Sequence, residues 1–215
     1  MTLIEQLNAV IIAIAEDISN NSGNSGSSSS DINVLLPRKI GATQRWYQSG
    51  LRHGADYPYP YSTSSSSYTS GTQFFIPFTA LEDATITGLE INCTSGQATA
   101  TVSLGIYASD SNNNVADPLF TSDPISCSAG GVKNAPCNVQ ITKGKVYWLS
   151  SLPIGTCTFN RNTTDSLFPI KGLAIANQSV IIGHYTTGNT NMTQSAPTSK
   201  LDIGNSAPRV LFITG

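Results

Sequence analysis

The stretch ATVSLGIYA, at residues 100–108, alternates large aliphatic residues with small or polar ones. Val102, Leu104 and Ile106 fall on one face of an extended chain, and Thr, Ser and Gly occupy the positions around them. A period of two residues over this length predicts a β-strand with one buried face. Such a strand needs further strands beside it, because a single strand cannot bury its apolar face alone.

Strand-like segments recur on both sides of this stretch. They are QFFIPFT (73–79), TITGLEINC (85–93), CNVQIT (137–142), KVYWLSS (145–151), SVIIGHY (179–185) and RVLFITG (209–215). Pro77 places the first of them at a sheet edge or a bulge, because proline lacks an amide hydrogen. Turn-like stretches rich in Gly, Asn, Asp and Pro separate the segments. This pattern predicts a mainly β fold, an antiparallel jelly-roll-like β-sandwich whose two inner faces form one core.

Residues 2–18 have a helical period instead. Thr2 and Glu5 form a T-x-x-E capping box at the start. The aliphatic stripe follows heptad spacing and consists of Ile4, Leu7, Ile11, Ile14 and Ile18. Isoleucine at both core positions of a heptad favours trimers or tetramers over dimers. We therefore expect a short helix for oligomerisation and attachment, with docking of an amphipathic helix on its own domain or on a partner as the alternative.

The chain is expected to have three parts. Residues 1–20 form the helical anchor, and residues 21–32 form a Ser/Gly-rich linker that separates the anchor from the rest. Residues 33–215 form the sandwich domain, which includes an extended strap at 43–72. A flexible tether suits a protein that has one end fixed while the other end searches.

Composition argues against several classes of partner. Only 11% of the residues are charged and the net charge is −2, without a basic block, which argues against nucleic acid as a partner. No stretch reaches the ~20 apolar residues that a membrane-spanning helix needs, so we expect no membrane insertion. The N-terminal apolar run lacks a Lys/Arg region and contains Glu5, so it is not expected to be a signal peptide. We therefore expect that the protein is made in a cytoplasm.

Four cysteines allow three disulfide pairings, and the sequence does not choose among them: Cys93, Cys127, Cys137 and Cys157. Cys127 and Cys137 flank a turn region, so a disulfide across this hairpin is geometrically feasible. Buried free thiols are the alternative, since such thiols often fill protein cores. The C-x-x-C spacing of zinc sites is absent, and the loop that starts at Asp110 lacks the Gly and Glu of a calcium loop. We therefore expect no metal site and no cofactor.

Catalytic patterns are sparse. Glycoside hydrolysis normally needs a pair of carboxylates, yet Glu90 is the one carboxylate inside a predicted strand, where we interpret it as an exposed residue of the polar face. The only histidines are His53 and His184, which we interpret as structural because no G-x-S-x-G motif or paired Cys–His motif accompanies them. The sequence thus predicts a protein that is not an enzyme.

A tyrosine-rich segment is the candidate for ligand binding. In HGADYPYPYSTSSSSYTS (53–70), four tyrosines stand among Ser, Thr and Pro: Tyr57, Tyr59, Tyr61 and Tyr68. Tyrosine offers a rigid apolar face with a hydroxyl, and serine offers adaptable hydrogen bonds, a mixture common in recognition surfaces. The alternative is an extended strap whose rings pack on the domain or on a neighbouring subunit, since Pro58 and Pro60 favour an extended path.

Taken in order, several segments resemble one family of proteins. They are Arg45-Trp46-Tyr47, QFFIPFT, ITGLEI, VSLGIYASDSNNNVADPLF, VQIT, TKGKVYWLSS and APRVLFITG. This series is similar to the sandwich domain of structural proteins of tailed bacteriophages, such as tail fibre, head fibre, receptor-binding and minor structural proteins. The resemblance covers roughly residues 44–215 and is strongest at the SLGIY and YWL strands. The helix and linker also resemble the attachment segments of phage fibres.

The resemblance implies a bacteriophage virion protein that is assembled in the host cytoplasm and exposed on the extracellular particle. We expect a homotrimer that contacts other virion proteins through its N-terminal helix and binds a host-surface glycan or protein through the sandwich. One alternative is a structural decoration or adaptor protein of the capsid or tail that binds no receptor. Another is a capsular polysaccharide depolymerase.

Overall fold

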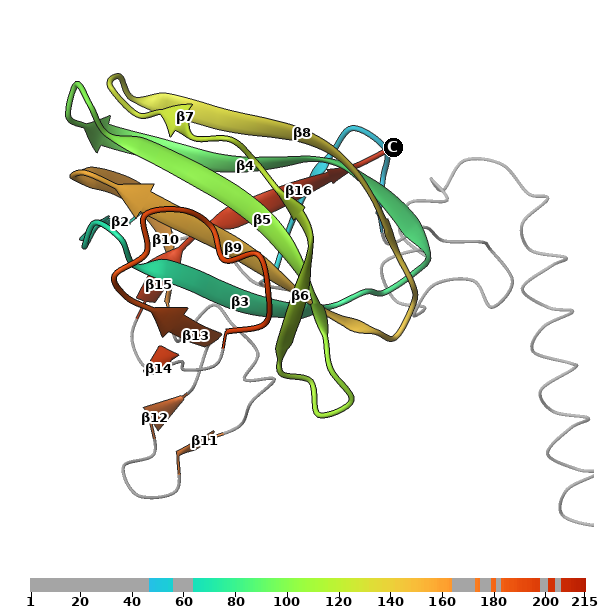
Figure 1. The fold of residues 1–215 in the computed structure, drawn as a ribbon. Helices are drawn as coiled ribbons and strands as arrows, with labels where there is room; N and C mark the ends of the chain where they lie inside the picture. The colour runs from blue at the N-terminus through green and yellow to red at the C-terminus, as the bar shows by residue number, and fades with distance from the viewer. Residues whose placement is uncertain are drawn as a thin grey trace, which may run out of the picture. The chain divides into compact units, whose positions relative to one another are not determined.

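The computed structural model describes residues 47–55, 64–163, 173–174, 179–180, 183–197, 201–203 and 206–215. The predicted helix at 2–18 and the predicted linker at 21–32 lie outside these residues. So does the aliphatic stripe Ile4, Leu7, Ile11, Ile14 and Ile18. Every regular element of the described ranges is a β-strand (Figure 1). None of the described residues belongs to a helix that could cross a membrane.

Two antiparallel sheets form a sandwich-like arrangement (Figure 1). The first sheet has seven strands in the order β1-β16-β4-β10-β15, with β8 paired to β4 and β2 paired to β10. Their bounds are β1 Arg52–Gly54, β2 Ser65–Tyr68, β4 Ala84–Gly96, β8 Gly131–Ile141, β10 Cys157–Thr163, β15 Ser206–Pro208 and β16 Val210–Thr214. Every registered pair in this sheet is antiparallel.

The second sheet also has seven strands, in the order β14-β13-β3-β9-β5-β6, with β7 paired to β5. Their bounds are β3 Gln73–Thr79, β5 Thr101–Ser109, β6 Val115–Thr121, β7 Ile125–Ser126, β9 Val146–Ile154, β13 Gly183–Thr186 and β14 Leu201–Ile203. All registered pairs are again antiparallel. A separate two-stranded ribbon consists of β11 Leu173–Ala174 and β12 Ser179–Val180. The predicted mainly β, antiparallel sandwich is therefore confirmed.

The main core lies between the sheets and uses the alternation that the sequence shows. Val102, Leu104 and Ile106 of β5 are all 0% exposed. Leu89 and Ile91 of β4 belong to the same apolar cluster from the other sheet. Full burial of one such side chain stabilises a fold by about 1.5–3 kcal/mol. This core determines which face each strand turns inward.

The outer face of the second sheet is buried as well, which the alternating pattern does not indicate. Phe75, Tyr107 and Trp148 form a separate apolar cluster on this face. Met192, from the segment 187–197 that follows β13, packs onto them and is itself 5% exposed. The second sheet is therefore covered on one side by the first sheet and on the other side by this segment.

Some predicted boundaries change. The segment 179–185 is not one strand, because it divides between β12 of the ribbon and β13 of the second sheet. The strand predicted at 137–142 begins earlier, at Gly131, since backbone pairing to β4 continues through residues without an apolar pattern. Pro77 is not on an edge strand, but the registered pairs of β3 with β13 end at Phe75, so Pro77 pairs only with β9 among the described residues. Within the predicted strap at 43–72, the described residues include the short strands β1 and β2.

The interpretation of Glu90 as an exposed residue is wrong. Glu90 is only 5% exposed, although its place on β4 alternates with the core residue Ile91. The guanidinium of Arg52, on β1, reaches over β16 and donates two hydrogen bonds to the Glu90 carboxylate, of which Nη2 to Oε1 spans 3.1 Å. Periodicity assigns a residue to a face, but it does not show that a long side chain from another strand covers that face.

Candidate functional site

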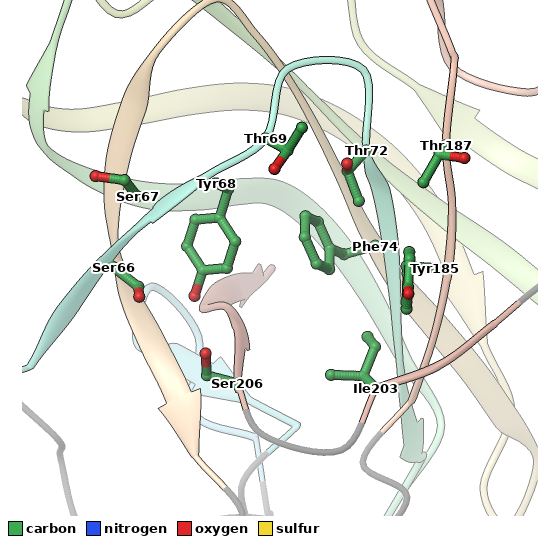
Figure 2. A pocket seen from close by; sticks show the side chains of 10 residues that line it. All are labelled: Ser66, Ser67, Tyr68, Thr69, Thr72, Phe74, Tyr185, Thr187, Ile203 and Ser206. Atoms are coloured by element: carbon green, nitrogen blue, oxygen red, sulfur yellow. The ribbon is translucent and has the colours of Figure 1, made fainter.

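A groove of about 510 Å³ lies between strands of the two sheets. Strands β2 and β15 of the first sheet contribute to one side, and β3, β13 and β14 of the second sheet contribute to the other (Figure 2). The described residues that line it are Ser66, Ser67, Tyr68, Thr69, Thr72, Phe74, Tyr185, Thr187, Ile203 and Ser206. Its volume lies within the range of roughly 300–1,000 Å³ that small-molecule pockets occupy.

Three aromatic rings form the apolar base of the groove. Tyr68 meets Phe74 edge-on at 5.1 Å between ring centroids, and Phe74 lies 6.3 Å from Tyr185. Phe74 and Ile203 are 8% and 4% exposed, and both belong to a small apolar cluster under the groove. Tyr68 and Tyr185 are half-buried. The two tyrosines therefore present ring surface to a ligand, while Phe74 and Ile203 support them.

Hydroxyl groups surround this aromatic base. Thr69, Thr72 and Thr187 lie along one side of the rings in Figure 2, and Ser66 and Ser206 lie on the other side. All the described lining side chains are uncharged. Such a set can stack on an apolar surface and exchange hydrogen bonds. It offers no carboxylate, imidazole, amine or thiol, among the described lining residues, that could transfer a proton near neutral pH.

Alternation along β2 directs its side chains. Ser66 and Tyr68 turn towards the groove (Figure 2), whereas the Ser67 hydroxyl pairs with Thr158 Oγ1 at 2.9 Å. Strand β2 is held by its antiparallel pairing to β10, in which Tyr68 lies opposite Cys157. The position of the Tyr68 ring is therefore set by strand register rather than by a loop.

A tight turn joins β2 to β3 at the rim of the groove. Gly71 adopts φ +77° in this turn, a backbone conformation that favours glycine. Its N–H donates to Pro153 O at 2.9 Å, and its carbonyl accepts from Asn189 N at 3.0 Å. A Cβ at position 71 would lie only 2.9 Å from Asn189 O. These contacts hold the turn against the segment after β13, which carries Thr187.

The hydroxyl of Tyr68 is buried and points towards Ser206 (Figure 2). Burial raises the pKa of Tyr68 to about 12, and the Ser206 hydroxyl and the charge of Arg161 oppose part of the rise. Tyr68 Oη makes no regular hydrogen bond within the described part of the chain, so its contact with Ser206 is weak.

The structure places one of the predicted binding residues in the groove, Tyr68. Outside the described residues lie the other three: Tyr57, Tyr59 and Tyr61. Sequence reasoning missed Phe74 and Tyr185, which complete the aromatic base. Both occur in predicted strands, but no local pattern indicates that β3 and β13 bring them beside Tyr68.

The structure has all four cysteines as free thiols, and the disulfide considered between Cys127 and Cys137 stays a prediction. Cys127 is 0% exposed and lies in the core between the sheets. Cys137 lies on β8, where its thiol donates to Ile86 O at 3.5 Å. The two thiols face different neighbours although they are close in sequence, because the chain passes between them from the second sheet to the first.

The loop at Asp110 is a capped turn. Asp110 Oδ1 accepts hydrogen bonds from Asn112 N at 2.8 Å and from Asn114 N at 2.7 Å. Asn113, between them, adopts φ +58°. Across the described ranges, no group of three or more His, Cys, Asp or Glu side chains could hold a metal ion. Among the described residues, the groove is the candidate binding site.

Sequence comparison identifies no family. No protein-family model matches the chain, and no curated protein matches it. The function of the chain is therefore inferred from the groove and from the sequence.

Proposed function

We propose that this chain is a non-enzymatic virion-surface protein of a tailed bacteriophage, and that its jelly-roll-like domain binds a host-surface glycan in the groove. The observation that carries the proposal is the combination of partly exposed tyrosine rings with hydroxyl groups around them (Figure 2). Because the described lining residues are uncharged, the glycan is an uncharged one.

The chemistry of a sugar suits this groove. A sugar ring has apolar faces made of C–H groups and an edge made of hydroxyl groups. Tyr68 and Tyr185 offer ring surface for the apolar face. Ser66, Thr187 and Ser206 offer hydroxyls, each of which can donate or accept a hydrogen bond. Recognition by this set therefore needs no charged group.

The N-terminal sequence supports a place in a virus particle. The aliphatic stripe of residues 4–18 suits a trimeric helical anchor, and the Ser/Gly-rich residues 21–32 suit a flexible tether. Other virion proteins would hold the anchor, residues 1–20, while the groove stays available to the host surface. The resemblance to phage structural proteins over roughly residues 44–215 supports the same assignment.

Glycan binding by the full-length chain tests the proposal. An array of neutral and acidic polysaccharides gives the first result, and calorimetry with a bound neutral glycan gives the dissociation constant. We expect Tyr185→Ala to weaken binding at least about tenfold, or ~1.4 kcal/mol, because ring surface is lost. Tyr185→Phe should keep most of the affinity, since it keeps the ring and loses only a hydroxyl.

The variant Leu119→Ala is the matched control. Leu119 is 46% exposed on β6 and does not line the groove, so its removal should leave binding unchanged. A chain that binds no glycan would contradict the proposal and support the decoration or adaptor role. Preference for acidic glycans would contradict the uncharged ligand. Release of reducing ends would contradict the non-enzymatic role and support a depolymerase.

A further inference from the structure

Three of the four cysteines lie in one region of the core, and we call them the thiol cluster: Cys93, Cys127 and Cys157. All three are 0% exposed and belong to the apolar cluster between the sheets. Cys93 lies near the end of β4, Cys157 is the first residue of β10, and Cys127 directly follows β7. Separate strands thus bring together thiols that are distant in sequence.

Backbone packing places Cys127 beside Cys157. In the antiparallel pairing of β4 with β10, Gly96 is the partner of Cys157. A Cβ added to Gly96 would lie 2.0 Å from Cys127 O and 3.2 Å from Cys127 Cβ, so Cys127 packs directly on Gly96. Cys127 N donates to Ala100 O at 2.7 Å. The Cys157 thiol donates to the next carbonyl along the chain, Thr101 O, at 3.7 Å.

Cys93 is less well placed for a bond to Cys157. Its strand partner is Phe159, and the register shifts between Thr158 and Phe159, so Cys93 does not lie opposite Cys157, whose own partner is Gly96. The two cysteines are therefore not a directly facing cross-strand pair, the arrangement that brings Cβ atoms closest to the roughly 3.5–4.5 Å that a disulfide needs. The Cys93 thiol instead donates to Ser95 O at 3.3 Å. Cys127 interacts with both other thiols of the cluster, but of the two only Cys157 lies opposite Gly96, on which Cys127 packs.

Cys127 and Cys157 hold their protons in the folded chain. Burial raises the pKa of Cys127, and the neighbouring Cys157 and Cys93 thiols raise it further. Burial also raises the pKa of Cys157, while a hydrogen bond with Cys127 opposes the rise. Because the thiolate is the nucleophile in disulfide exchange, the folded chain should react slowly. Oxidation is therefore expected while the chain folds.

We propose that Cys127 and Cys157 form a disulfide when the chain folds in the presence of a small-molecule disulfide such as oxidised glutathione. The thiolate of one cysteine attacks the oxidant, releases one small thiol and forms a mixed disulfide. The thiolate of the other cysteine then attacks the mixed disulfide and releases the second small thiol. Two protein thiols are oxidised, the small disulfide is reduced, and both protons end on the released thiols.

Refolding the full-length chain in a buffer of oxidised and reduced glutathione tests the proposal. Remaining thiols are alkylated, and peptides are mapped by mass spectrometry without reduction. We expect one cross-linked pair, Cys127 with Cys157, and alkylated Cys93 and Cys137. A bond between Cys127 and Cys137, any bond to Cys93, or four alkylated cysteines would overturn the proposal.

Matched variants and a stability measurement give further readouts. Cys137→Ser should keep the cross-link, whereas Cys157→Ser should lose it. If Cys157→Ser fails to fold, the peptide map of the unaltered chain still decides. The oxidised chain should also unfold at a higher urea concentration than the same sample after reduction, because a cross-link restricts the unfolded chain. An equal or lower midpoint would contradict a bond that fits the folded structure.

Discussion

The two faces of strand β3 differ in what covers them. Gln73 and Phe74 are consecutive residues, and their side chains lie on opposite faces. Gln73 lies on the outer face of the second sheet. The segment 187–197 covers this face, and we call it the closed side. Phe74 faces the inner side, the open side, where the groove lies. Both sides combine aromatic rings with hydroxyl groups. Composition alone therefore does not distinguish a packed surface from a binding surface.

On the closed side, the polar groups satisfy one another. Gln73 is 0% exposed, and its Nε2 donates to Tyr107 Oη at 2.9 Å and to Ser150 Oγ at 3.0 Å. Its Oε1 accepts from Thr193 N at 3.1 Å. Tyr107 Oη donates in turn to Thr193 O at 2.6 Å. This network ties β3, β5 and β9 to the covering segment.

On the open side, the polar groups face space instead. The hydroxyls of Thr187 and Ser206 lie around the rings of Tyr68 and Tyr185 at the groove (Figure 2). A polar set that satisfies itself can close a surface, whereas a set that faces a groove is available to a ligand. The two sides of β3 therefore differ in whether their polar groups bond to one another or face the groove.

Removing Gln73 should break the closed side and have the largest effect on stability. Gln73→Leu deprives Thr193 N and the Ser150 hydroxyl of their hydrogen-bond partner in this network. Buried groups without a partner cost about 1–3 kcal/mol each, so we expect the free energy of unfolding to fall by about 3 kcal/mol. Urea unfolding of the full-length chain measures this change.

Gln140→Leu is the control for that prediction. Gln140 is exposed on β8, and its Nε2 donates to Thr85 Oγ1 at 2.8 Å. Water can replace this hydrogen bond, so the free energy of unfolding should change by less than about 0.5 kcal/mol. Equal losses in the two variants would mean that the buried network is not what holds the closed side together.

Alkaline pH should weaken the open side through Tyr68. The pKa of Tyr68 is about 12 in the folded chain, against an ordinary value of 10.0. Between these values the unfolded chain loses the phenol proton while the folded chain keeps it, so stability that is fully present below pH 10 falls as the pH rises towards about 12. From about pH 9 to about pH 11, Tyr68 should account for a loss of about 1 kcal/mol.

The variant Tyr68→Phe isolates this effect. Urea unfolding at both pH values should show a smaller alkaline loss in the variant than in the unaltered chain. A decline should persist in the variant, because burial also raises the pKa of Tyr107 on the closed side. Identical losses in variant and unaltered chain would mean that the Tyr68 phenol is not buried as the structure has it.

The strands were predictable from the sequence wherever apolar residues alternate with polar or small ones. Residues 100–108 and 209–215 correspond to β5 and β16, because strand alternation is a local property that burial between two sheets preserves. The described residues of 179–185 are in strands as predicted, but they belong to two strands of different sheets, β12 and β13. Sequence reasoning missed the covering segment 187–197, which has no period and is held by the Gln73 network and Met192.

The groove was predictable only at Tyr68. Phe74, Tyr185 and Ile203 come from three other strands, and alternation assigns each to a face without naming its neighbours. The burial of Glu90 escaped prediction for the same reason, since its cover comes from Arg52 on a strand that is not its direct partner. Long-range register, rather than local pattern, builds these sites.

Replacing Thr187 tests the open side of β3, and of the changes discussed it should have the smallest effect on stability. Thr187 is exposed and lines the groove, so Thr187→Val should leave the free energy of unfolding within about 0.5 kcal/mol. Glycan affinity should fall about fivefold, near the ~1 kcal/mol that one hydrogen bond contributes. Thr79→Val, at an exposed position outside the groove, should change neither quantity. If both variants bind alike, the groove recognises its ligand by the rings alone, and the hydroxyls of the open side are a solvated surface.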